Sequence, residues 1–450
     1  MAATSSTSLP PAAPVPGRRP RSVVARRSPS LTAVGAAAAG TPPRSPAQER
    51  QAPTRVPREP RPRATVLAHL RAVPFFDPAE DPRSFHGRAF EDAAGAAEPR
   101  VLWASNKKPR EGSEDWLTAT EFGDTPEVFR EKVRLLAELI RVSERTVAYT
   151  GAGLSVAAGI AMAANGSSGT KKSGASAGTN AEPTLAHYVM AAINRHGLLH
   201  GWVQQNHDGL PQKAGYKQED INEIHGSWFD PSNPVVKYSG TLRGDLFEDL
   251  ERQANTADLC LVMGTSLTGL NADQVAEMPA RRSAAGKALG TVIVSPQRTA
   301  LDGKASLRIY AKADDVMRAL AAELGLGSVA SIVKGLGALI PKDSRVIVPY
   351  DQQGFRSDTV RTYWDLRSGQ KVRLGENNNC AGARQPSSEK LTSRDVGEVT
   401  GREAARACIT ICFSGGASMR LGLWWLEAAQ RGGVAQLPVV NVSPQEAKAP

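Results

Sequence analysis

Short apolar runs recur along the middle of the chain, and glycine or polar residues follow each of them. The clearest are Thr146–Thr150, Leu259–Met263 and Thr291–Val294. Runs of this length that end at turn residues indicate buried β-strands. Apolar residues at helical spacing lie around them, at about 126–140, 246–254, 274–285 and 315–324. Strands that alternate with helices predict an α/β fold in which a parallel sheet is covered on both faces.

The pattern becomes β-like from about residue 328. Candidate strands follow one another at 345–348, 362–366, 371–374, 409–413 and 438–442. Ser368 and Gly369 predict a hairpin turn between the second and third of these strands. Residues 376–403 indicate a loop. We therefore expect a separate β-rich domain over residues 328–450.

Positive charge is concentrated at the N-terminus. Residues 1–63 hold eleven arginines and two glutamates, so they carry +9 of the chain's net charge of +10. The rest of this segment is mainly Ala, Pro and Ser, which cannot bury enough apolar surface to offset chain entropy, and we expect disorder. An Arg-rich, Ser-rich and acid-poor segment is typical of a transit peptide for a mitochondrion or plastid. A plain solvated arm and a nuclear or nucleic-acid-binding arm are the alternatives.

The remaining composition narrows the class of protein. Residues after 63 are nearly neutral, so nucleic-acid binding by the folded part is not indicated. No run of about 18 apolar residues occurs, and no membrane-spanning helix is expected. Four cysteines in 450 residues do not make a disulfide framework, which favours a reducing compartment. Residues 64–124 are mixed in character and are expected to form an extension that packs on the body.

Three polar or glycine-rich segments follow strand-like or apolar runs. They are residues 150–155 (Thr-Gly-Ala-Gly-Leu-Ser), 205–210 (Gln-Asn-His-Asp-Gly-Leu) and 264–267 (Gly-Thr-Ser-Leu). Because ligands of parallel sheets bind at the carboxyl ends of the strands, we expect these segments to line one crevice. Glycines at a strand-to-helix turn let the backbone approach a pyrophosphate, and free amides at the helix start favour negative charge. An ordinary tight turn is the alternative for each glycine segment.

The order of these segments, together with residues 223–226 (Glu-Ile-His-Gly), resembles the sirtuins, the NAD-dependent protein deacylases. The resemblance extends over roughly residues 126–326. It implies a Rossmann-like domain over residues 125–327 that uses NAD as cofactor and acts on an acyl-lysine protein or peptide. In the implied reaction, the acyl oxygen attacks the ribose carbon that bears nicotinamide, nicotinamide leaves, and the acyl group passes to ADP-ribose.

The resemblance also assigns roles to individual side chains. Asn206 and Asp208 match residues that line the nicotinamide pocket, and Asp208 would recognise the carboxamide. Gln205 would contact the ribose, while His207 stands where sirtuins usually have an aliphatic residue and so would alter base recognition. His225 matches the general base that deprotonates a ribose hydroxyl, a task that suits an imidazole near neutral pH. A polar surface loop and a purely structural histidine are the alternatives.

The other implied cofactor contacts lie on the glycine segments and at two later positions. They are Gly151, Ala152, Gly153, Ser155 and Gly159 from the first segment, Gly264, Thr265 and Ser266 from the third, Ser295, and Val316. Ser295 occupies the place of a sirtuin asparagine that holds the adenosine ribose. Val316, with Asp315, lies near the adenine-binding loop of the family.

The sequence departs from the sirtuin pattern after the first glycine segment. Sirtuins continue with Gly-Ile-Pro-Asp-Phe-Arg, whereas residues 159–164 are Gly-Ile-Ala-Met-Ala-Ala. In the family the aromatic residue shields the reactive ribose and the arginine helps to hold the cofactor. Lys171 or Lys172 is a candidate source of the missing charge. Residues 165–181 are rich in Gly, Ser, Ala and Lys, and form either a lid over the ligand or a plain linker.

A second departure concerns zinc. Sirtuins usually carry two cysteine pairs between the His-Gly step and the third segment, but between Gly226 and Gly264 this chain has only Cys260. A closed zinc site needs four ligands, mostly Cys or His, so no structural zinc and no other metal site is expected. Residues 227–236 indicate instead a packed loop with aromatic anchors. Residues 235–242 are a candidate edge for the substrate peptide.

The favoured function is therefore NAD-dependent removal of an acyl group from lysine, with His225 as the base. The missing Asp-aromatic-Arg segment favours a second hypothesis, a catalytically weakened module that senses NAD or ADP-ribose. NAD-dependent ADP-ribosyl transfer is a third.

Overall fold

The computed structural model describes residues 61–91, 93–109, 113–160, 178–236, 240–337, 340–375, 391–414 and 416–447. These ranges belong to one compact unit. The predictions for the basic tail up to residue 60, for the loop at 161–177 with Lys171 and Lys172, and for residues 376–390 lie outside them. Part of the candidate peptide edge, residues 237–239, lies outside them as well.

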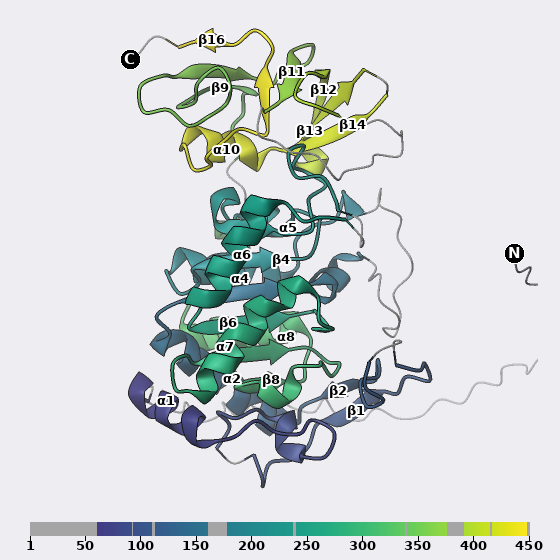
Figure 1. Cartoon of the computed structure of the whole chain (residues 1–450), viewed down its shortest axis with the longest axis vertical. Coiled ribbons are helices and arrows are strands. Elements are labelled where there is room, and N and C mark those ends of the chain that lie inside the picture. The colour runs from purple at the N-terminus through teal and green to yellow at the C-terminus, as the bar shows by residue number, and fades with distance from the viewer. Residues whose placement is uncertain are drawn as a thin grey trace, which may run out of the picture. The chain divides into compact units, whose positions relative to one another are not determined.

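The centre of the described part is a six-stranded parallel sheet (Figure 1). Its strands are β3 (Thr146–Thr150), β4 (Gly201–Gln204), β5 (Ile221–Glu223), β6 (Leu259–Met263), β7 (Gly290–Val294) and β8 (Leu307–Ile309). They lie in the order β5-β4-β3-β6-β7-β8. The direction of strand addition therefore reverses between β3 and β6, which is where doubly wound sheets bind dinucleotides. The predicted Rossmann-like α/β class is confirmed.

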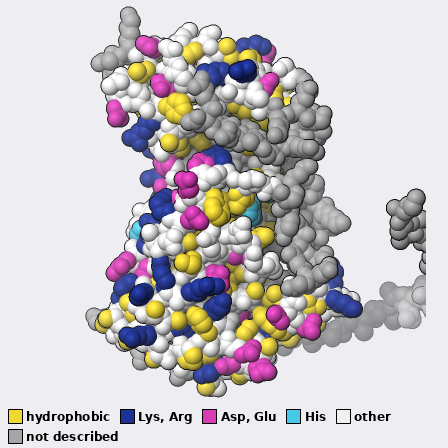
Figure 2. Space-filling view, in the orientation of Figure 1, with side chains coloured by type: hydrophobic (Ala, Val, Ile, Leu, Met, Phe, Trp, Pro, Cys, Tyr) yellow, Lys and Arg dark blue, Asp and Glu magenta, His cyan; other side chains and the backbone are white. Residues whose placement is uncertain are grey.

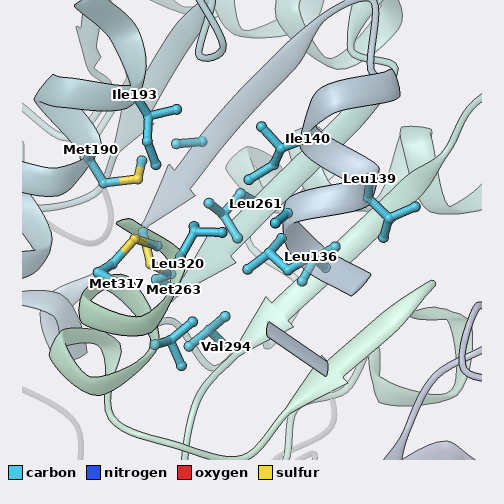
Figure 3. Close-up of a cluster of buried hydrophobic side chains, with 14 of the residues drawn as sticks. Leu136, Leu139, Ile140, Met190, Ile193, Leu261, Met263, Val294, Met317 and Leu320 are labelled. Carbon is cyan, nitrogen blue, oxygen red and sulfur yellow. The ribbon is translucent and has the colours of Figure 1, made fainter. Parts of the chain in front are cut away.

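Helices cover both faces of this sheet. They are α1 (Arg63–Ala72), α2 (Pro126–Val142), α4 (Leu185–Arg195), α5 (Leu210–Lys213), α6 (Gly244–Thr256), α7 (Gln274–Ala284), α8 (Ala313–Leu324) and α9 (Val329–Gly335). Figure 3 shows the core on one face, where Leu136 of α2, Met190 of α4 and Leu320 of α8 surround Leu261 of β6. Residues of α6 and α7 form the core on the opposite face. Burial of these apolar stripes is the main term that holds the layers together.

The helix predicted to begin at residue 126 is α2, and its start follows its sequence. Pro126 occupies the first turn, where its missing N–H costs nothing, and the side chain of Thr125 accepts the amide of Val128. Lys132 of α2 is fully buried and forms a 2.6 Å ion pair with Asp124. Its ammonium also donates to the carbonyl of Phe85, so α2 and the preceding extension are joined by a buried charged contact.

The segment before α2 packs along the sheet region through helix α1. It contains α1, a 3-10 helix η1 (Pro82–Phe85), and the two antiparallel strands β1 (Arg100–Trp103) and β2 (Glu121–Gly123). Val66 and Leu70 of α1 belong to the same core cluster as α2. Val101 and Leu102 of β1 are 58% and 66% exposed, so the apolar run at 101–103 does not enter this core.

The C-terminal β region, residues 340–447, contains two antiparallel sheets and one helix. One sheet has the order β16-β10-β9 and the other β14-β13-β12-β11-β15. Their strands are β9 (Arg345–Val348), β10 (Thr362–Asp365), β11 (Lys371–Leu374), β12 (Val396–Glu403), β13 (Cys408–Phe413), β14 (Ser418–Gly422), β15 (Val439–Asn441) and β16 (Gln445–Glu446), and the helix is α10 (Trp424–Gln430). The sheets and the helix enclose an apolar core of their own.

Two predictions for this region were wrong. Residues 376–403 are not all loop, because 396–403 form β12, which pairs with β11 and β13. The Ser368-Gly369 turn makes no hairpin, because β10 and β11 belong to different sheets. The amide of Gly369 instead donates to the carbonyl of Val399 on β12, at 2.8 Å. Turn residues mark where the chain reverses, but strand partners are chosen by the long-range packing of the core.

The surface charges and the length of the helices agree with what the composition predicts. Figure 2 shows acidic and basic side chains interspersed over the visible face of the described residues. No single helix in the described ranges is long and apolar enough to cross a membrane. Helices α8 and α9 pass that test only as a pair, and they are bent by 95° at the break between them.

Candidate functional site

The first and third glycine segments interlock at the point where the strand order reverses. The amide of Gly153 donates to the carbonyl of Gly264 at 2.8 Å, and the amide of Gly151 donates to Met263 at 3.1 Å. A Cβ on Gly151 would lie 2.6 Å from the Gln205 side chain, and one on Gly153 would lie 2.7 Å from the Cα of Gly264. These glycines are therefore required by the contact between two loops. The amide of Gly153, expected to be free for a phosphate, is already used.

The chain after the first glycine segment forms a short 3-10 helix, η2 (Ala152–Ala158). Ala152 is half-buried, and Ser155 is buried within this turn. Gly159 ends the turn with a left-handed φ of 80° and is exposed. The sequence predicted that a helix start after the first glycine segment faces a phosphate. In the structure this helix start is the 3-10 turn η2.

The third segment carries backbone strain. Leu267 adopts a φ of 52° although it is not glycine, and its side chain is buried in the core beneath α7. Thr265 is half-buried and Ser266 is exposed. Left-handed backbone at a bulky residue costs about 1–2 kcal/mol and persists where the surroundings hold it, often at functional sites.

Ser155, Asn206 and Asp208 form one buried hydrogen-bonded cluster. The hydroxyl of Ser155 donates to Asp208 Oδ2 at 2.7 Å. Asn206 Nδ2 donates to the same hydroxyl at 3.0 Å and to the carbonyl of Gly151 at 3.1 Å. Asp208 is 1% exposed, and its second oxygen accepts the amide of Leu210 at 3.1 Å. The structure thus brings the first segment together with the two residues predicted to line the nicotinamide pocket.

Gln205 belongs to a second hydrogen-bonded chain, which the sequence did not reveal. Its side-chain amide donates to the hydroxyl of Tyr149. Tyr149 in turn donates to Asp273 at 2.8 Å, and Asp273 accepts the amides of Gly269 and Leu270 at 2.8 and 2.9 Å. The chain links β3 to the loop before α7 and fixes the orientation of Gln205. Tyr149 and Asp273 are 124 residues apart, and no local pattern pairs them.

His225 lies directly after β5, at the same edge of the sheet. Gly226 follows it with a φ of 89°, and a Cβ there would lie 2.4 Å from the carbonyl of Pro234. The amide of Val236 donates to the carbonyl of His225 at 3.0 Å. Asn233 Nδ2 donates to the carbonyl of Glu223 at 2.9 Å. The loop at 227–236 therefore folds back on the His-Gly step and holds its backbone in place.

His207 connects the polar segment to the His225 step. Its Nδ1 lies 2.8 Å from the carbonyl of Gly226, and because a carbonyl can only accept, this nitrogen carries the proton. The amide of Trp228 donates to the carbonyl of His207 at 2.9 Å. The ring centroids of His207 and Trp228 are 6.1 Å apart. A residue that is aliphatic in the sirtuin pattern is here a tether between two parts of the site.

The electrostatics keep the candidate base neutral. Burial lowers the pKa of His225 below its ordinary value of 6.5, the nearby His207 lowers it further, and a hydrogen bond with the backbone of Gln205 opposes the shift. Burial also lowers the pKa of His207, against a hydrogen bond to Gly226 and the charge of Asp208. Both imidazoles are therefore unprotonated at neutral pH, which is the state in which one can accept a proton.

Two buried groups near this site were not expected from the sequence. Burial raises the pKa of Glu223, with the charge of Asp230 as the next cause, to about 8. His187 of α4 is fully buried, and burial lowers its pKa to about 4 against the charge of Asp208. Its Nε2 has no hydrogen-bond partner among the described residues. The sequence did not indicate a role for His187, because a single histidine on an apolar helix face has no distinctive pattern.

The two predicted contacts on the adenosine side differ from each other. Ser295 follows β7 at the carboxyl edge, is 8% exposed, and its hydroxyl accepts the amide of Gln297 at 3.1 Å. Val316 is fully buried inside α8 and belongs to the core cluster of that face. A side-chain contact between Val316 and a cofactor is therefore not supported, because helical periodicity turns this position toward the sheet.

The described residues contain no group of three or more His, Cys, Asp or Glu side chains that could hold a metal ion. Cys260 lies fully buried on β6 as expected, and the absence of structural zinc stays a prediction.

The polar side chains of this site suit the nicotinamide half of a dinucleotide. A carboxylate, an amide and a hydroxyl lie together in Asp208, Asn206 and Ser155, and such groups match the donors and acceptors of a carboxamide. His225 follows β5 at the same sheet edge. The residues present therefore fit the nicotinamide side of NAD, with the start of η2 beside it.

No protein-family model matches the chain. The NAD-dependent protein deacetylase sirtuin-7 of Rattus norvegicus is 32% identical over 259 residues, which cover 46% of this chain and 63% of that protein. The protein of the same name from Homo sapiens is 32% identical over 258 residues, with the same coverage. The chain thus spans less than two thirds of the length of these relatives.

Solved structures of Sir2 enzymes also match. One with a p53 peptide and NAD+ is 22% identical, covers 43% of this chain and 98% of its own, and has a TM-score of 0.37. The order of the strands in the sheet and these sequence relatives agree, and the chain is similar to sirtuins over 46% of its length.

Proposed function

We propose that this protein is an NAD-dependent protein-lysine deacylase. The observation that carries the proposal is the convergence of Asn206, Asp208 and His225 at the carboxyl edge of β4 and β5, beside the interlocked glycine segments. The relatives' names state an NAD-dependent protein deacetylase activity. The segment before residue 61 also supports a proposed mitochondrial or plastid location, because it is rich in Arg and Ser and poor in acids.

Each of the three residues has a task that its surroundings permit. Asn206 and Asp208 would hold the carboxamide, because both are buried and fixed by Ser155 and Gly151. His225 would accept a proton from a ribose hydroxyl, because burial keeps it neutral. Bound NAD would supply a ribose carbon open to attack and nicotinamide as the leaving group. Gln205 would contact the ribose from its tether on Tyr149.

A sensor of NAD or ADP-ribose is the second candidate. Residues 161–164 lack the Asp, aromatic and Arg of the family pattern, so the shield over the reactive ribose is missing from this stretch. The neutral His225 favours the enzyme over the sensor, because a module that only binds has no need of a proton acceptor at this edge. ADP-ribosyl transfer is the third candidate.

One experiment separates these functions. Purified full-length protein is incubated with NAD, with and without an acetyl-lysine peptide, and nicotinamide and deacetylated peptide are measured. Release that requires the peptide and matches deacetylation supports the deacylase. Release without peptide indicates ADP-ribosyl transfer or hydrolysis, and tight NAD binding without release indicates the sensor.

The same assay tests the candidate base. We expect His225→Ala to lower turnover by about 100-fold or more, because a general base contributes about 10²–10⁴-fold. NAD affinity, measured by calorimetry, should change little, because the carboxamide contacts come from Asn206 and Asp208. The control is His196→Ala, which changes a histidine at the end of α4. Unchanged turnover in His225→Ala would remove this residue from the mechanism.

A further inference from the structure

The C-terminal β region contacts the polar segment through one buried side chain, Trp424. Gly209 follows Asp208 directly and has a φ of 62°, and a Cβ there would lie 2.8 Å from the Trp424 ring. The indole N–H of Trp424 donates to Gln218 Oε1 at 2.7 Å. The same oxygen accepts from Gln212 of α5 at 3.1 Å. Trp424 is 3% exposed, so it fills the space behind the residue that follows Asp208.

The loop after His225 enters the same contact. Phe229 is fully buried and belongs to the core cluster of the C-terminal β region. Its ring lies edge-on to Trp424, with 5.4 Å between centroids, and its carbonyl accepts the amide of Gly422 at 3.0 Å. The loop in which the sirtuin pattern has zinc ligands is thus anchored in an apolar core that the C-terminal region supplies.

Two polar contacts surround this apolar centre. Arg431, which follows the last residue of α10, donates to both carboxylate oxygens of Glu219, at 3.0 and 3.1 Å. Arg406 donates to the side chain of Asn180 at 2.7 Å. Half-exposed pairs of this kind contribute little free energy but fix orientation. The contact of Arg431 with Glu219 fixes the segment from 208 to 219, which begins with the predicted carboxamide contact.

The position of Asp208 therefore depends on what packs against Gly209. Asp208 Oδ1 caps the amide of Leu210, so the carboxylate and the start of α5 move together. If Trp424 were smaller, Gly209 would lose its packing surface and Gln218 would lose a donor. A displacement of about 1 Å at such a contact is enough to lower function by about 100-fold.

We propose that Trp424 is a positioning residue, through which the C-terminal β region holds Asp208 where it recognises nicotinamide. The expected effect on NAD binding rests on the proposed function. The contact between Trp424 and Gly209 does not depend on it.

The test uses the full-length protein with Trp424→Phe, Trp424→Ala and the control Trp425→Phe. Trp425 lies on the same helix, is 5% exposed, and its indole N–H has no partner among the described residues. Hydrogen exchange of residues 205–213 is measured without ligand. Affinities for NAD and for ADP-ribose are measured by calorimetry, because ADP-ribose lacks the nicotinamide that Asp208 would hold.

We expect Trp424→Phe to speed exchange at 205–213 and to weaken NAD binding about tenfold, the effect of removing one buried hydrogen bond. ADP-ribose binding should change by less than about twofold, and Trp425→Phe should change neither quantity. Equal weakening of both ligands, or exchange at the wild-type rate, would overturn the proposal. If the wild-type protein binds no NAD, the proposed function fails, and the exchange rates still decide whether Trp424 holds this segment. Trp424→Ala repeats the comparison with the whole ring removed.

Discussion

At the scale of single residues, the pair of histidines distinguishes this site from the family pattern. His207 donates to the carbonyl of Gly226 and sits beside His225. Its positive charge at low pH disfavours a second positive charge on His225. Replacement of an aliphatic residue by histidine therefore changes both the tethering and the proton affinity of the candidate base.

This arrangement predicts a shift in the pH profile of nicotinamide release. The rate should fall as pH drops through the pKa of His225, which lies below 6.5, because a protonated imidazole accepts no further proton. In His207→Asn the acidic limb should move to higher pH, since the group that lowers the pKa of His225 is gone while an N–H donor to Gly226 remains. His207→Val, which removes the donor as well, is the comparison. An acidic limb at the wild-type position in His207→Asn would contradict this coupling.

Glu223 makes the stability of the fold depend on pH. Its folded-state pKa is raised to about 8 from an ordinary value of 4.5, so the folded protein holds this proton more tightly than the unfolded chain. The stabilisation is fully present below pH 4.5 and is lost as the pH rises through about 8. Burial of Asp230 raises the pKa of that carboxyl too, and it acts in the same direction.

We therefore expect Glu223→Gln to flatten this dependence. The free energy of unfolding of the wild type should fall from about pH 5 to about pH 8 by up to a few kcal/mol, at about 1.4 kcal/mol per unit of pKa difference. The variant should lose less, because glutamine keeps an acceptor for Gln204 without a charge. Urea unfolding followed across this range measures the effect. Equal slopes in both proteins would show that Glu223 is not buried as a neutral acid.

At the scale of elements, the glycine segments show how one residue type serves two purposes. The resemblance explained these glycines by a nearby phosphate. The structure shows that Gly151, Gly153 and Gly264 also let the loops after β3 and β6 touch. The reversal of strand order brings these two loops together, so the constraint comes from the topology of the sheet.

Two glycines with positive φ, one crowded and one with open space around it, separate the cost of packing from the cost of backbone strain. Gly264 has a φ of 67°, and a Cβ there would lie 2.3 Å from the amide nitrogen of Leu154. Gly269, in the same loop, has a φ of 90° with nothing within 4 Å of its Cβ position. We expect Gly264→Ala to cost about 4 kcal/mol or more, and Gly269→Ala about 1–2 kcal/mol. Similar midpoints of thermal unfolding for both variants would contradict the interlocked packing.

At the scale of the whole molecule, the packing of the α/β region and the core of the C-terminal β region depend on each other. Phe229 lies in the sequence of the α/β region, yet its side chain completes the core of the C-terminal β region. Trp424 reaches in the opposite direction, to Gln218. Loss of either region would expose an apolar surface of the other.

This exchange of side chains predicts that the described parts of the α/β region and of the C-terminal β region unfold together. Tryptophan fluorescence, to which Trp364, Trp424 and Trp425 contribute, should change at the same urea concentration as the far-UV circular dichroism of the helices. Coincident transitions are the test of cooperative unfolding. Two separate transitions would show that the C-terminal region is stable without the contacts of Trp424 and Phe229.

The sequence predicted the strands β3, β6 and β7 and the helices α2, α6, α7 and α8, but it missed β4, β5, β8, α1 and α4, and it predicted strand partners in the C-terminal region poorly. Strands β3 and β6 end at the predicted residues, because short apolar runs closed by glycine leave little choice. β12 was missed, since its residues alternate polar and small side chains without a continuous apolar run. In the site, Asn206 and Asp208 were proposed from their order along the chain. The links of Gln205 to Tyr149 and of Gly209 to Trp424 join residues far apart in sequence.

What the sequence determined by itself is the alternation of strands and helices and the order of its polar segments, because periodicity and turn residues act over a few positions. The tertiary structure alone decided that β10 and β11 part into different sheets, that Val316 faces the core, and that Trp424 stands behind Asp208. These features depend on which apolar surfaces meet after the chain has folded, and that choice is made by packing over the whole molecule.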